Sequence, residues 1–376
     1  MKIALDAIGI HYSGGGRTSI LNLLHHLFTL DAGNEYLVFL SQPEPSLETR
    51  AGNVIQHIVP IKNRFAVRIY AQAIIPYAIQ KYDLVHFTKN LGVFGPLPPS
   101  VVTIHDLTTI LYPQVVPWID YYYWRSLQGI TVRNARLVIT VSHIAARDIE
   151  ELFHVSSEKI RVIHHGCADF FKPSSQDAIN QVCQKYNISP PYILHVGRID
   201  LKKNLTVLVK AYERLCKRTG FQGKLVLVGE VYKKSEDTAL IPTISELGLQ
   251  DKVIITGYVP DHDLPHLYSG AMFCVYPSIH EGFGLAPLEA MTCGSPLIAH
   301  KAGAVEEVVG DAGIVLETVD VDNLAEQMYR LVVDNALRQT LRERGLIRSQ
   351  QFSWQKAAEK LLEVYNEVGP RDKWKN

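Results

Sequence analysis

The residues best suited to chemistry lie in one short segment of the second half of the chain, from His280 to Glu289. Residues 272–276 before it form an apolar run that predicts a buried strand. Pro287 suits the first turn of a helix, where its missing N–H is not needed, and the two glycines in the segment let a ligand approach the backbone. Glu281 and Glu289 flank this helix start, so they can bind two sets of sugar hydroxyls with backbone N–H groups facing a phosphate between them. A capping or dipole-compensating glutamate in the first helical turn is the alternative for Glu289.

Two cations follow a second predicted strand, at 192–196. Arg198 lies in the loop after it, and Lys203 lies at the start of the next helix. Fixed cations beside helix N–H groups suit a diphosphate. A solvated basic turn is the alternative.

Two further signals lie in the first half of the chain. Gly14, Gly15 and Gly16 leave backbone N–H groups uncovered at a helix start, which favours an anion, although a flexible turn explains the glycines equally well. The loop is not a dinucleotide fingerprint, because Ser19 stands where the third glycine is needed. His105 ends a predicted strand, and a lone histidine of this kind is more often structural.

The elements that must position these residues alternate strand with helix. Candidate strands occur at 2–7, 36–40, 54–59, 84–87, 101–105, 137–141 and 160–164, and again at 192–196, 224–228, 253–256, 272–276, 297–299 and 314–316. Several of them are apolar throughout, which is typical of strands buried on both faces. Apolar residues between 205 and 215 recur at helical spacing. Such repeats predict right-handed crossovers and doubly wound sheets, whose sites lie at the carboxyl ends of the strands. We therefore expect an α/β protein with two Rossmann-like doubly wound domains facing across a cleft, at 1–172 and 191–355, with a linker at 173–190.

Composition excludes several classes of function. The 376 residues carry 38 Lys+Arg and 38 Asp+Glu, so no basic balance points to nucleic acid as a partner. The five cysteines have neither zinc nor redox spacing, which indicates a reducing compartment. An acidic residue at position 6 comes too early for a secretory signal, and no uninterrupted apolar run reaches about 18 residues. We expect a cytoplasmic protein.

Taken together, the motifs resemble those of retaining glycosyltransferases of family 4, which have the GT-B fold. The resemblance rests on the order of the Gly14–Gly16 loop, His105-Asp106, Gly197-Arg198 with Lys203-Asn204, Gly257-Tyr258-Val259 and the two glutamates spaced by seven residues. It covers essentially the whole chain. The glutamate pair joined to the Arg/Lys pair is its most specific part.

The resemblance implies a role for each matching position. Arg198 and Lys203 would bind the donor diphosphate and stabilise the leaving group, and Glu281 would contact the donor hexose. Phe283, Gly284 and Leu285 would lie over the sugar and phosphates, while Glu289 would bind the ribose and Tyr258 and Val259 would bind the base. In the first domain, His105 would lie near the reaction centre, and Gly15 and Gly16 would face the diphosphate and the acceptor. The chain departs from the family at His165-Gly166, where Asn-Gly is usual, and at Gly303-Ala304-Val305-Glu306, where Gly-x-Pro-Glu is frequent. By the same likeness, the end segment 356–376 would cross back onto the first domain.

No cofactor and no metal are expected besides the nucleotide-sugar co-substrate. The metal-binding pattern Asp-x-Asp occurs at Asp261–Asp263 and Asp320–Asp322, but each pair precedes a helical pattern, so helix capping explains them better. Leaving-group charge would then be neutralised by Arg198 and Lys203. We expect front-face attack, in which the departing phosphate oxygen helps deprotonate the acceptor hydroxyl.

The predicted function is transfer of a hexose from a nucleotide sugar to a glycan or lipid-linked saccharide in polysaccharide biosynthesis. UDP-glucose is the first choice of donor and GDP-mannose the second. The alternatives are a GT-B sugar phosphorylase, a nucleotide-sugar epimerase and a non-catalytic nucleotide-sugar-binding protein. Segments 62–70 and 117–125 mix cations with apolar or aromatic residues. One interpretation is an acceptor platform or a peripheral contact with the inner face of the membrane. The favoured interpretation is that both segments form helices with buried aromatic faces.

Overall fold

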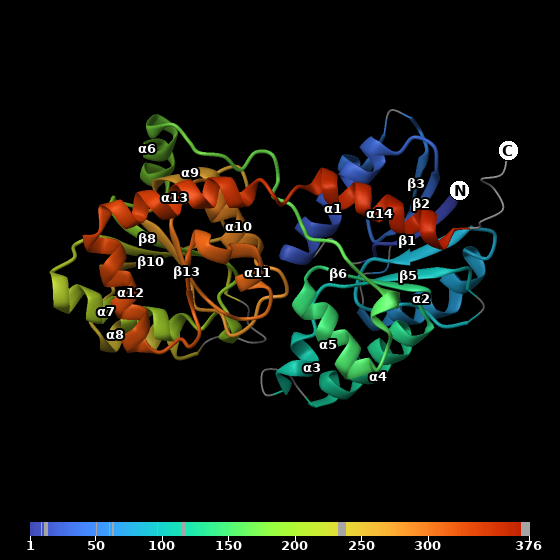
Figure 1. Ribbon diagram of the computed structural model, residues 1–376, viewed down its shortest axis with the longest axis horizontal. Helices are drawn as coiled ribbons and strands as arrows, with labels where there is room; N and C mark the ends of the chain where they lie inside the picture. The colour runs from blue at the N-terminus through green and yellow to red at the C-terminus, as the bar shows by residue number, and fades with distance from the viewer. Residues whose placement is uncertain are drawn as a thin grey trace. The chain divides into compact units, whose positions relative to one another are not determined.

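The chain folds into two compact units in a computed structural model (Figure 1). The structure describes residues 1–8, 10, 14–49, 51–59, 61, 64–95, 97–113, 118–231 and 238–369, without the side chains of residues 64, 65, 67, 68, 119 and 120. The first unit comprises Met1–Gly166 and the segment from Ser353 onward, and the second comprises Cys167–Phe352.

A seven-stranded, all-parallel sheet forms the centre of the first unit, in the order β3-β2-β1-β4-β5-β6-β7. Its strands are β1 (Lys2–Asp6), β2 (Glu35–Leu40), β3 (Val54–Ile58), β4 (Leu84–Phe87), β5 (Ser100–Ile104), β6 (Leu137–Thr140) and β7 (Ile160–Val162). Its helices are α1 (Gly15–Leu30), α2 (Arg64–Ala78), α3 (Thr108–Leu111), α4 (Trp118–Asn134), α5 (His143–Phe153) and α14 (Trp354–Val368), with 3-10 turns at Pro45–Leu47 and Ser157–Lys159.

The second unit has a six-stranded parallel sheet in the order β10-β9-β8-β11-β12-β13. Its strands are β8 (Tyr192–Val196), β9 (Lys224–Val228), β10 (Val253–Gly257), β11 (Phe273–Tyr276), β12 (Leu297–His300) and β13 (Ile314–Leu316). Its helices are α6 (Gln176–Lys185), α7 (Leu205–Thr219), α8 (Leu240–Glu246), α9 (Leu264–Gly270), α10 (Leu285–Thr292), α11 (Val305–Val309), α12 (Val321–Val333) and α13 (Asn335–Ser349), with 3-10 turns at Leu201–Lys203 and Gly310–Ala312.

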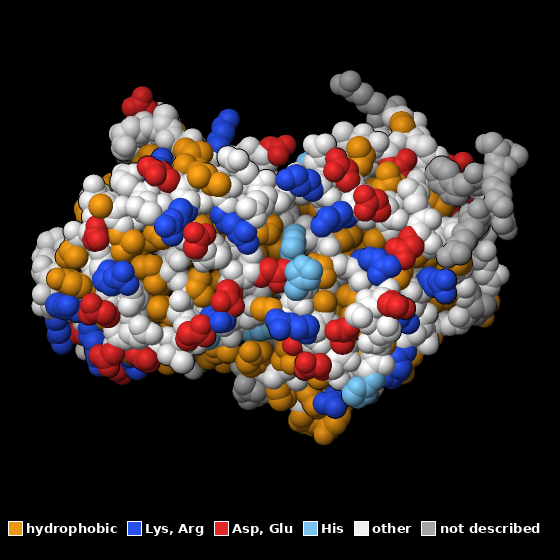
Figure 2. Space-filling model, viewed as in Figure 1, with side chains coloured by type: hydrophobic (Ala, Val, Ile, Leu, Met, Phe, Trp, Pro, Cys, Tyr) orange, Lys and Arg blue, Asp and Glu red, His pale blue; other side chains and the backbone are white. Residues whose placement is uncertain are grey.

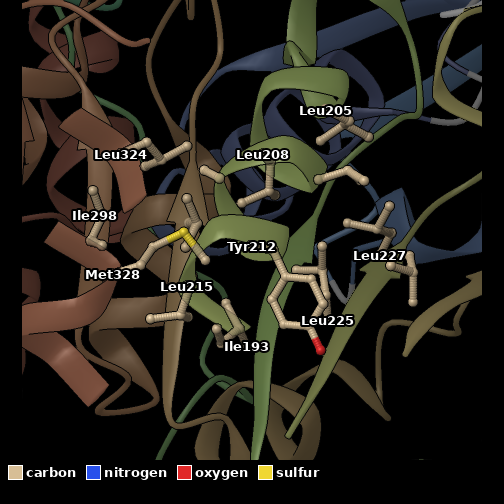
Figure 3. Packing of buried hydrophobic residues seen from close by; sticks show 14 of the residues in the cluster. Ile193, Leu205, Leu208, Tyr212, Leu215, Leu225, Leu227, Ile298, Leu324 and Met328 are labelled. Atoms are coloured by element: carbon tan, nitrogen blue, oxygen red, sulfur yellow. The ribbon is translucent and has the colours of Figure 1, made fainter. Parts of the chain in front are cut away.

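Every run predicted as a strand forms one. Strands such as β4, β5 and β8 are buried on both faces of a parallel sheet, whereas the edge strand β3 alternates half-buried and exposed residues. The predicted helix at 205–215 is likewise confirmed as α7. Leu208 and Tyr212 are fully buried and point from α7 onto β8 and β9, beside Met328 of α12 (Figure 3). Burial of one side chain of this size contributes about 1.5–3 kcal/mol to the stability of the fold. The buried face of α7 therefore holds this helix against the sheet.

The predicted linker at 173–190 lies inside the second unit. Its central residues form the amphipathic α6, which is capped by Ser175, buries Ile179 and Val182, and packs against α9. The chain passes between units at Gly166–Cys167 and again at Phe352–Ser353. Proline and serine around α6 reflect the ends of this helix instead of a flexible connection. In the first unit, α14 packs against α1 (Figure 1).

The aromatic segment of α4 has two faces. Tyr121 and Trp124 pack against the core of the first unit. Trp118 and Tyr122, however, are 71% and 62% exposed, so the expectation of buried aromatic faces is wrong for these two side chains. Residue 117 and residues 62–63 of the two segments fall outside the described residues.

Charged side chains of both signs are interspersed over the visible surface of each unit (Figure 2). This mixture agrees with the formal net charge of zero. Throughout the described part of the chain, each helix is too short or too polar to span a bilayer.

Candidate active site

Three loops meet at the carboxyl edge of the second sheet. The backbone N–H of Gly197, after β8, donates to the carbonyl of Val228 at 2.9 Å, and that of Gly229, after β9, donates to the carbonyl of Gly257 at 2.9 Å. A side chain at Gly229 would overlap the carbonyl of Gly197. These contacts place the predicted Arg198 and Tyr258 segments along one edge.

Lys203 and Glu281 form an ion pair at this edge. The Lys203 ammonium donates to Glu281 Oε1 at 2.5 Å, and the Ser278 hydroxyl donates to the same oxygen at 2.7 Å. The side chains of Lys203 and Glu281 are only 19% and 17% exposed. Burial alone would raise the pKa of Glu281, but Lys203 and Ser278 together lower it, so the carboxylate stays ionised.

The backbone around this pair is fixed from two sides. The N–H of Ile279 donates to the carbonyl of Lys202 at 2.8 Å, and the N–H of Ala304 donates to the carbonyl of Glu281 at 3.1 Å. A side chain at Gly303 would overlap that carbonyl of Glu281. The loop that departs from the family pattern at 303–306 therefore supports Glu281 directly.

Arg198 follows β8 and is exposed. Arg198 and Lys203 both act on Asp200: burial raises the pKa of Asp200, and the charges of Lys203, Lys202 and Arg198 oppose that rise. Asp200 also accepts from the N–H of Lys202 at 3.1 Å, which holds the turn Leu201–Lys203. Two cations are therefore presented at the end of β8, as the spacing predicts.

Phe283, Gly284 and Leu285 form the entry to α10. Gly284 has φ 102°, a conformation that favours glycine, and α10 begins at Leu285. Phe283 is buried, with its ring 5.8 Å from that of Phe352. The segment can therefore offer backbone groups to a ligand, while the phenyl ring belongs to the core.

Glu289 lies in the second turn of α10 instead of the first, because the helix begins at Leu285. It is therefore not a capping glutamate. Its carboxyl accepts from the hydroxyl of Tyr268 at 2.8 Å. Burial, supported by the charge of Asp261, raises the pKa of Glu289 to about 8, so this carboxyl is largely protonated at neutral pH.

Glu281 and Glu289 therefore have different neighbours and different protonation. Glu281 is an anion held by Lys203, whereas Glu289 is a neutral acid held by Tyr268. Tyr268 lies on α9, the helix that follows the base-binding segment predicted at Tyr258 and Val259. The side chain of Tyr258 is 59% exposed and that of Val259 only 3%, so Tyr258 alone can offer its side chain to a ligand.

The first unit has its own carboxyl edge, where His105 follows β5. The N–H at Nε2 of His105 donates to the carbonyl of Thr88 at 2.8 Å, and the side chain of Asn90 accepts from the backbone N–H of His105 at 2.7 Å. Nδ1 of His105 then carries a lone pair, and it has no hydrogen-bond partner among the described residues. Burial lowers the pKa of His105, so the ring is neutral.

His165 stands where the family usually has asparagine. Its ring centroid lies 5.6 Å from that of His105 and 5.1 Å from that of Trp354. A side chain at Gly166 would overlap the backbone of Trp354. His165-Gly166 therefore packs against the start of α14, and His165 also contacts the ring of His105. The departure from the family pattern at these two positions was the sequence signal for this packing.

The glycine loop leads into α1. Gly14 has φ 125°, α1 begins at Gly15, and a side chain at Gly16 would meet open space. Nearby, Asp6 ends β1 and Lys89 follows β4. Burial raises the pKa of Asp6 to about 6 and lowers the pKa of Lys89 to about 8. Neither residue is among the predicted site residues; their position at the carboxyl ends of strands was the available signal.

The two Asp-x-Asp pairs differ. Asp320 caps α12, accepting from the N–H of Asn323 at 2.8 Å, so the capping prediction is confirmed there. Asp263 precedes α9 but makes no capping bond. Its carboxylate accepts instead from Lys185 Nζ and from the Tyr186 hydroxyl, both at 2.7 Å, which joins α6 to α9.

A cavity of about 1160 Å³ lies elsewhere in the first unit. The described residues between β4 and β5 form no helix, and the cavity lies beside this irregular crossover, lined by Val93, Thr131, Arg136 and Lys159 among others. None of the predicted site residues lines it.

The fold and these edges define a protein of two Rossmann-like α/β units with GT-B architecture. Residues 13–168 match the model of Glycosyltransferase Family 4, and residues 180–348 match that of Glycosyl transferases group 1. The chain belongs to the family 4 glycosyltransferases and is a glycosyltransferase.

Individual relatives agree with this assignment. The O-antigen chain mannosyltransferase B of Escherichia coli is 32% identical over 77% of this chain and 76% of its own length. The serotype-specific mannosyltransferase WbdA of Escherichia coli is 27% identical over 72% of this chain, which spans only 33% of that protein. The crystal structure of Anabaena Alr3699/HepE in complex with UDP and glucose has a TM-score of 0.78 at 21% identity, covering 98% of this chain and 100% of that one.

Proposed function

We propose that the protein is a retaining, metal-independent mannosyltransferase that uses GDP-mannose to extend a glycan or lipid-linked saccharide in polysaccharide synthesis. Both Escherichia coli relatives are mannosyltransferases, and one acts on an O-antigen chain. Their names support a proposal with mannose ahead of glucose, which reverses the order of donors suggested by the sequence alone.

The ion pair between Lys203 and Glu281 is the observation that carries this proposal. A buried ammonium and a buried carboxylate at one edge match the two chemically different parts of a nucleotide sugar. Lys203, with Arg198, would neutralise the diphosphate as the sugar departs, while Glu281 would accept hydroxyls of the hexose. Glu289 would bind the ribose, Tyr258 and Val259 the base, and the backbone of 283–285 the phosphates.

We propose metal independence for two reasons: aspartates of the Asp-x-Asp pairs already have other partners, and the chain supplies positive charge of its own. Of the Asp-x-Asp residues, Asp320 caps a helix and Asp263 is bound by Lys185 and Tyr186. Two cations at the end of β8 can supply the positive charge that a divalent ion would otherwise provide.

The proposed transfer is a front-face exchange. The bond between the anomeric carbon and the diphosphate oxygen breaks, the acceptor oxygen bonds to the same face of that carbon, and its proton passes to the departing oxygen. His105, with a free lone pair on Nδ1, would accept a hydroxyl hydrogen bond near this centre. Gly15 and Gly16 would contribute backbone N–H groups from the first turn of α1.

UDP-glucose is the second candidate donor. The structural neighbour from Anabaena was solved with UDP and glucose, and it shares the fold over almost the whole chain. Tyr258 and Val259 do not separate uracil from guanine.

Donor identity is tested first by thermal shift with GDP, UDP, ADP and their sugars, since a ligand of the folded form raises its melting temperature. Transfer of mannose from GDP-mannose to saccharide acceptors, with EDTA present, should follow, and NMR of the product should show the donor's anomeric configuration retained.

Turnover with UDP-glucose alone would select the second donor. Phosphate-dependent turnover without a nucleotide sugar would indicate a phosphorylase, interconversion of free nucleotide sugars an epimerase, and binding without turnover a non-catalytic protein.

We also propose that a cytoplasmic location with peripheral contact at the inner face of the membrane accompanies a lipid-linked acceptor. Exposed Trp118 and Tyr122 of α4 would make that contact. Co-sedimentation with liposomes should depend on anionic lipid and fall in a Trp118→Ala/Tyr122→Ala variant.

A further inference from the structure

A buried histidine beneath the Lys203–Glu281 pair has no place in the proposed reaction. His195 is the fourth residue of β8 and is fully buried. Its Nδ1 lies 2.8 Å from the carbonyl oxygen of Val275 in β11. Because a carbonyl only accepts, Nδ1 carries the proton and Nε2 carries a lone pair.

Nε2 of His195 has no hydrogen-bond partner among the described residues. Leaving a buried polar atom unpaired is unfavourable, and native proteins rarely do so without a reason. The bond to Val275 explains only Nδ1. A hydrophobic side chain at this position would fill the same volume without an unpaired nitrogen.

The local geometry shows what Nε2 faces. Backbone pairing between β8 and β11 ends at Leu194 and Cys274, so the ring of His195 occupies the space where the strands part. A Cβ placed on Gly197 would lie 3.3 Å from Nε2, 3.4 Å from Lys203 Cε and 3.8 Å from Lys203 Nζ. The imidazole and the end of Lys203 therefore share one small space, which exists because residue 197 is glycine.

The charge of the ring also fits this position. Burial, with a smaller contribution from the charge of Lys203, lowers the pKa of His195 to about 4 against the opposing effects of Val275 and Glu281. The ring is neutral at physiological pH. A neutral acceptor can orient an ammonium group without cancelling its charge, whereas Glu281 cancels that charge when it pairs with Lys203.

We propose that His195 is a positioning residue for Lys203, and this inference rests on the proposed function. In the free protein Lys203 donates to Glu281. When a nucleotide sugar binds, Glu281 turns to the hexose, and the Lys203 ammonium donates one N–H to His195 Nε2 and another to the diphosphate. His195 thereby fixes the direction of Lys203 while its full positive charge faces the leaving group.

Two substitutions separate the two nitrogens of the ring. His195→Asn keeps a donor for the carbonyl of Val275 and removes the acceptor at the Nε2 position. His195→Gln places an acceptor near Nε2. We expect His195→Asn to melt close to wild type while kcat with the active donor falls roughly tenfold to a hundredfold, the loss expected for a hydrogen bond to a charged group. KM should change by less than kcat, and His195→Gln should recover part of the loss.

A double-mutant cycle with Lys203→Ala distinguishes positioning from structural support. If His195 acts through Lys203, His195→Asn should change kcat by less than about twofold once Lys203 is alanine. Equal losses in both backgrounds, or normal kcat in His195→Asn, would overturn the inference while leaving the transferase assignment intact.

Nitrogen NMR of labelled histidine gives a readout that does not need turnover. In the absence of acceptor, the nucleotide sugar that serves as donor should shift the resonance of unprotonated His195 Nε2 toward that of a hydrogen-bonded nitrogen. It should leave Nδ1 unchanged and have no such effect in Lys203→Ala. An unshifted Nε2 in a protein that binds the nucleotide sugar would refute the role of His195. A protein that binds no nucleotide would refute the proposed function, and the inference with it.

Discussion

Nucleotide binding should release a proton from Glu289. In the free protein burial raises the pKa of this carboxyl to about 8, so it enters the reaction mixture at neutral pH as a neutral acid held by Tyr268. Ribose hydroxyls that donate to the carboxylate would favour its charged form and lower its pKa. The perturbation to apply is pH, with Glu289→Gln as the variant that keeps a neutral acceptor for Tyr268 but cannot ionise.

The size of the effect follows from proton linkage. If the pKa of Glu289 falls in the complex toward its ordinary value of 4.5, binding at pH 6.5 releases close to one proton. Affinity then rises with pH by at most tenfold per pH unit and levels off above about pH 8. Because Glu289 is only half-buried, we expect roughly a tenfold gain from pH 6 to pH 8.

Calorimetric titration with GDP, or with UDP if the protein accepts that nucleotide, measures both the affinity and the number of protons released. Heats recorded in buffers of different ionisation enthalpy give the number of protons released, and comparison with Glu289→Gln cancels the titration of the nucleotide's own phosphate. Glu246→Gln, an exposed glutamate of the same unit, should behave as wild type. Equal proton release in wild type and Glu289→Gln would show that the carboxyl does not meet the ribose.

Three further predictions follow from the same edge and its supports. Lys203→Ala and Arg198→Ala should each lower kcat about 10²–10³-fold, measured with saturating donor, and near-normal turnover in both would contradict their role. Asp263→Ala should destabilise the protein by about 1–3 kcal/mol in urea unfolding, because it leaves the half-buried hydroxyl of Tyr186 without its acceptor. Asp320→Ala should remove only a cap worth about 1 kcal/mol, and the reverse order would refute this explanation. EDTA should leave the transfer rate unchanged, and restoration of a lost rate by Mg²⁺ or Mn²⁺ would refute metal independence.

The sheets could be predicted from sequence because a strand buried on both faces needs a continuous apolar run. Residues 84–87 and 192–196 are such runs, and each forms a fully buried strand. In each sheet, parallel pairing places the loops that follow the strands at one edge. The position of His105 at the edge of the first sheet and that of Arg198 at the edge of the second could therefore be predicted from the strands alone. The helix at 205–215 was equally clear, since its buried residues recur at helical spacing.

The errors have a common physical origin: side chains whose partners are distant in sequence. Asp263 has the local pattern of a cap, but Lys185, the last residue of α6, and Tyr186 directly after it bind the carboxylate instead. The proline- and serine-rich segment around α6 has the composition of a linker, but the apolar face of that helix packs on α9. The position of Glu289 is a separate, local error: α10 begins at Leu285, two residues before Pro287, so Glu289 falls in the second turn. Local composition cannot reveal such tertiary partners.

The Lys203–Glu281 pair joins two signals that the sequence presents separately, 78 residues apart. Each charge is largely buried, so a ligand that takes one partner and leaves the other unpaired incurs a penalty of roughly 3–5 kcal/mol. Inorganic phosphate or a free monosaccharide offers a new partner to only one of the two. A molecule with phosphate and sugar hydroxyls in one piece can replace both partners at once. The pair therefore favours a sugar attached to a phosphate over either fragment alone, which is a physical reason to expect that the donor sugar and the diphosphate bind as one ligand.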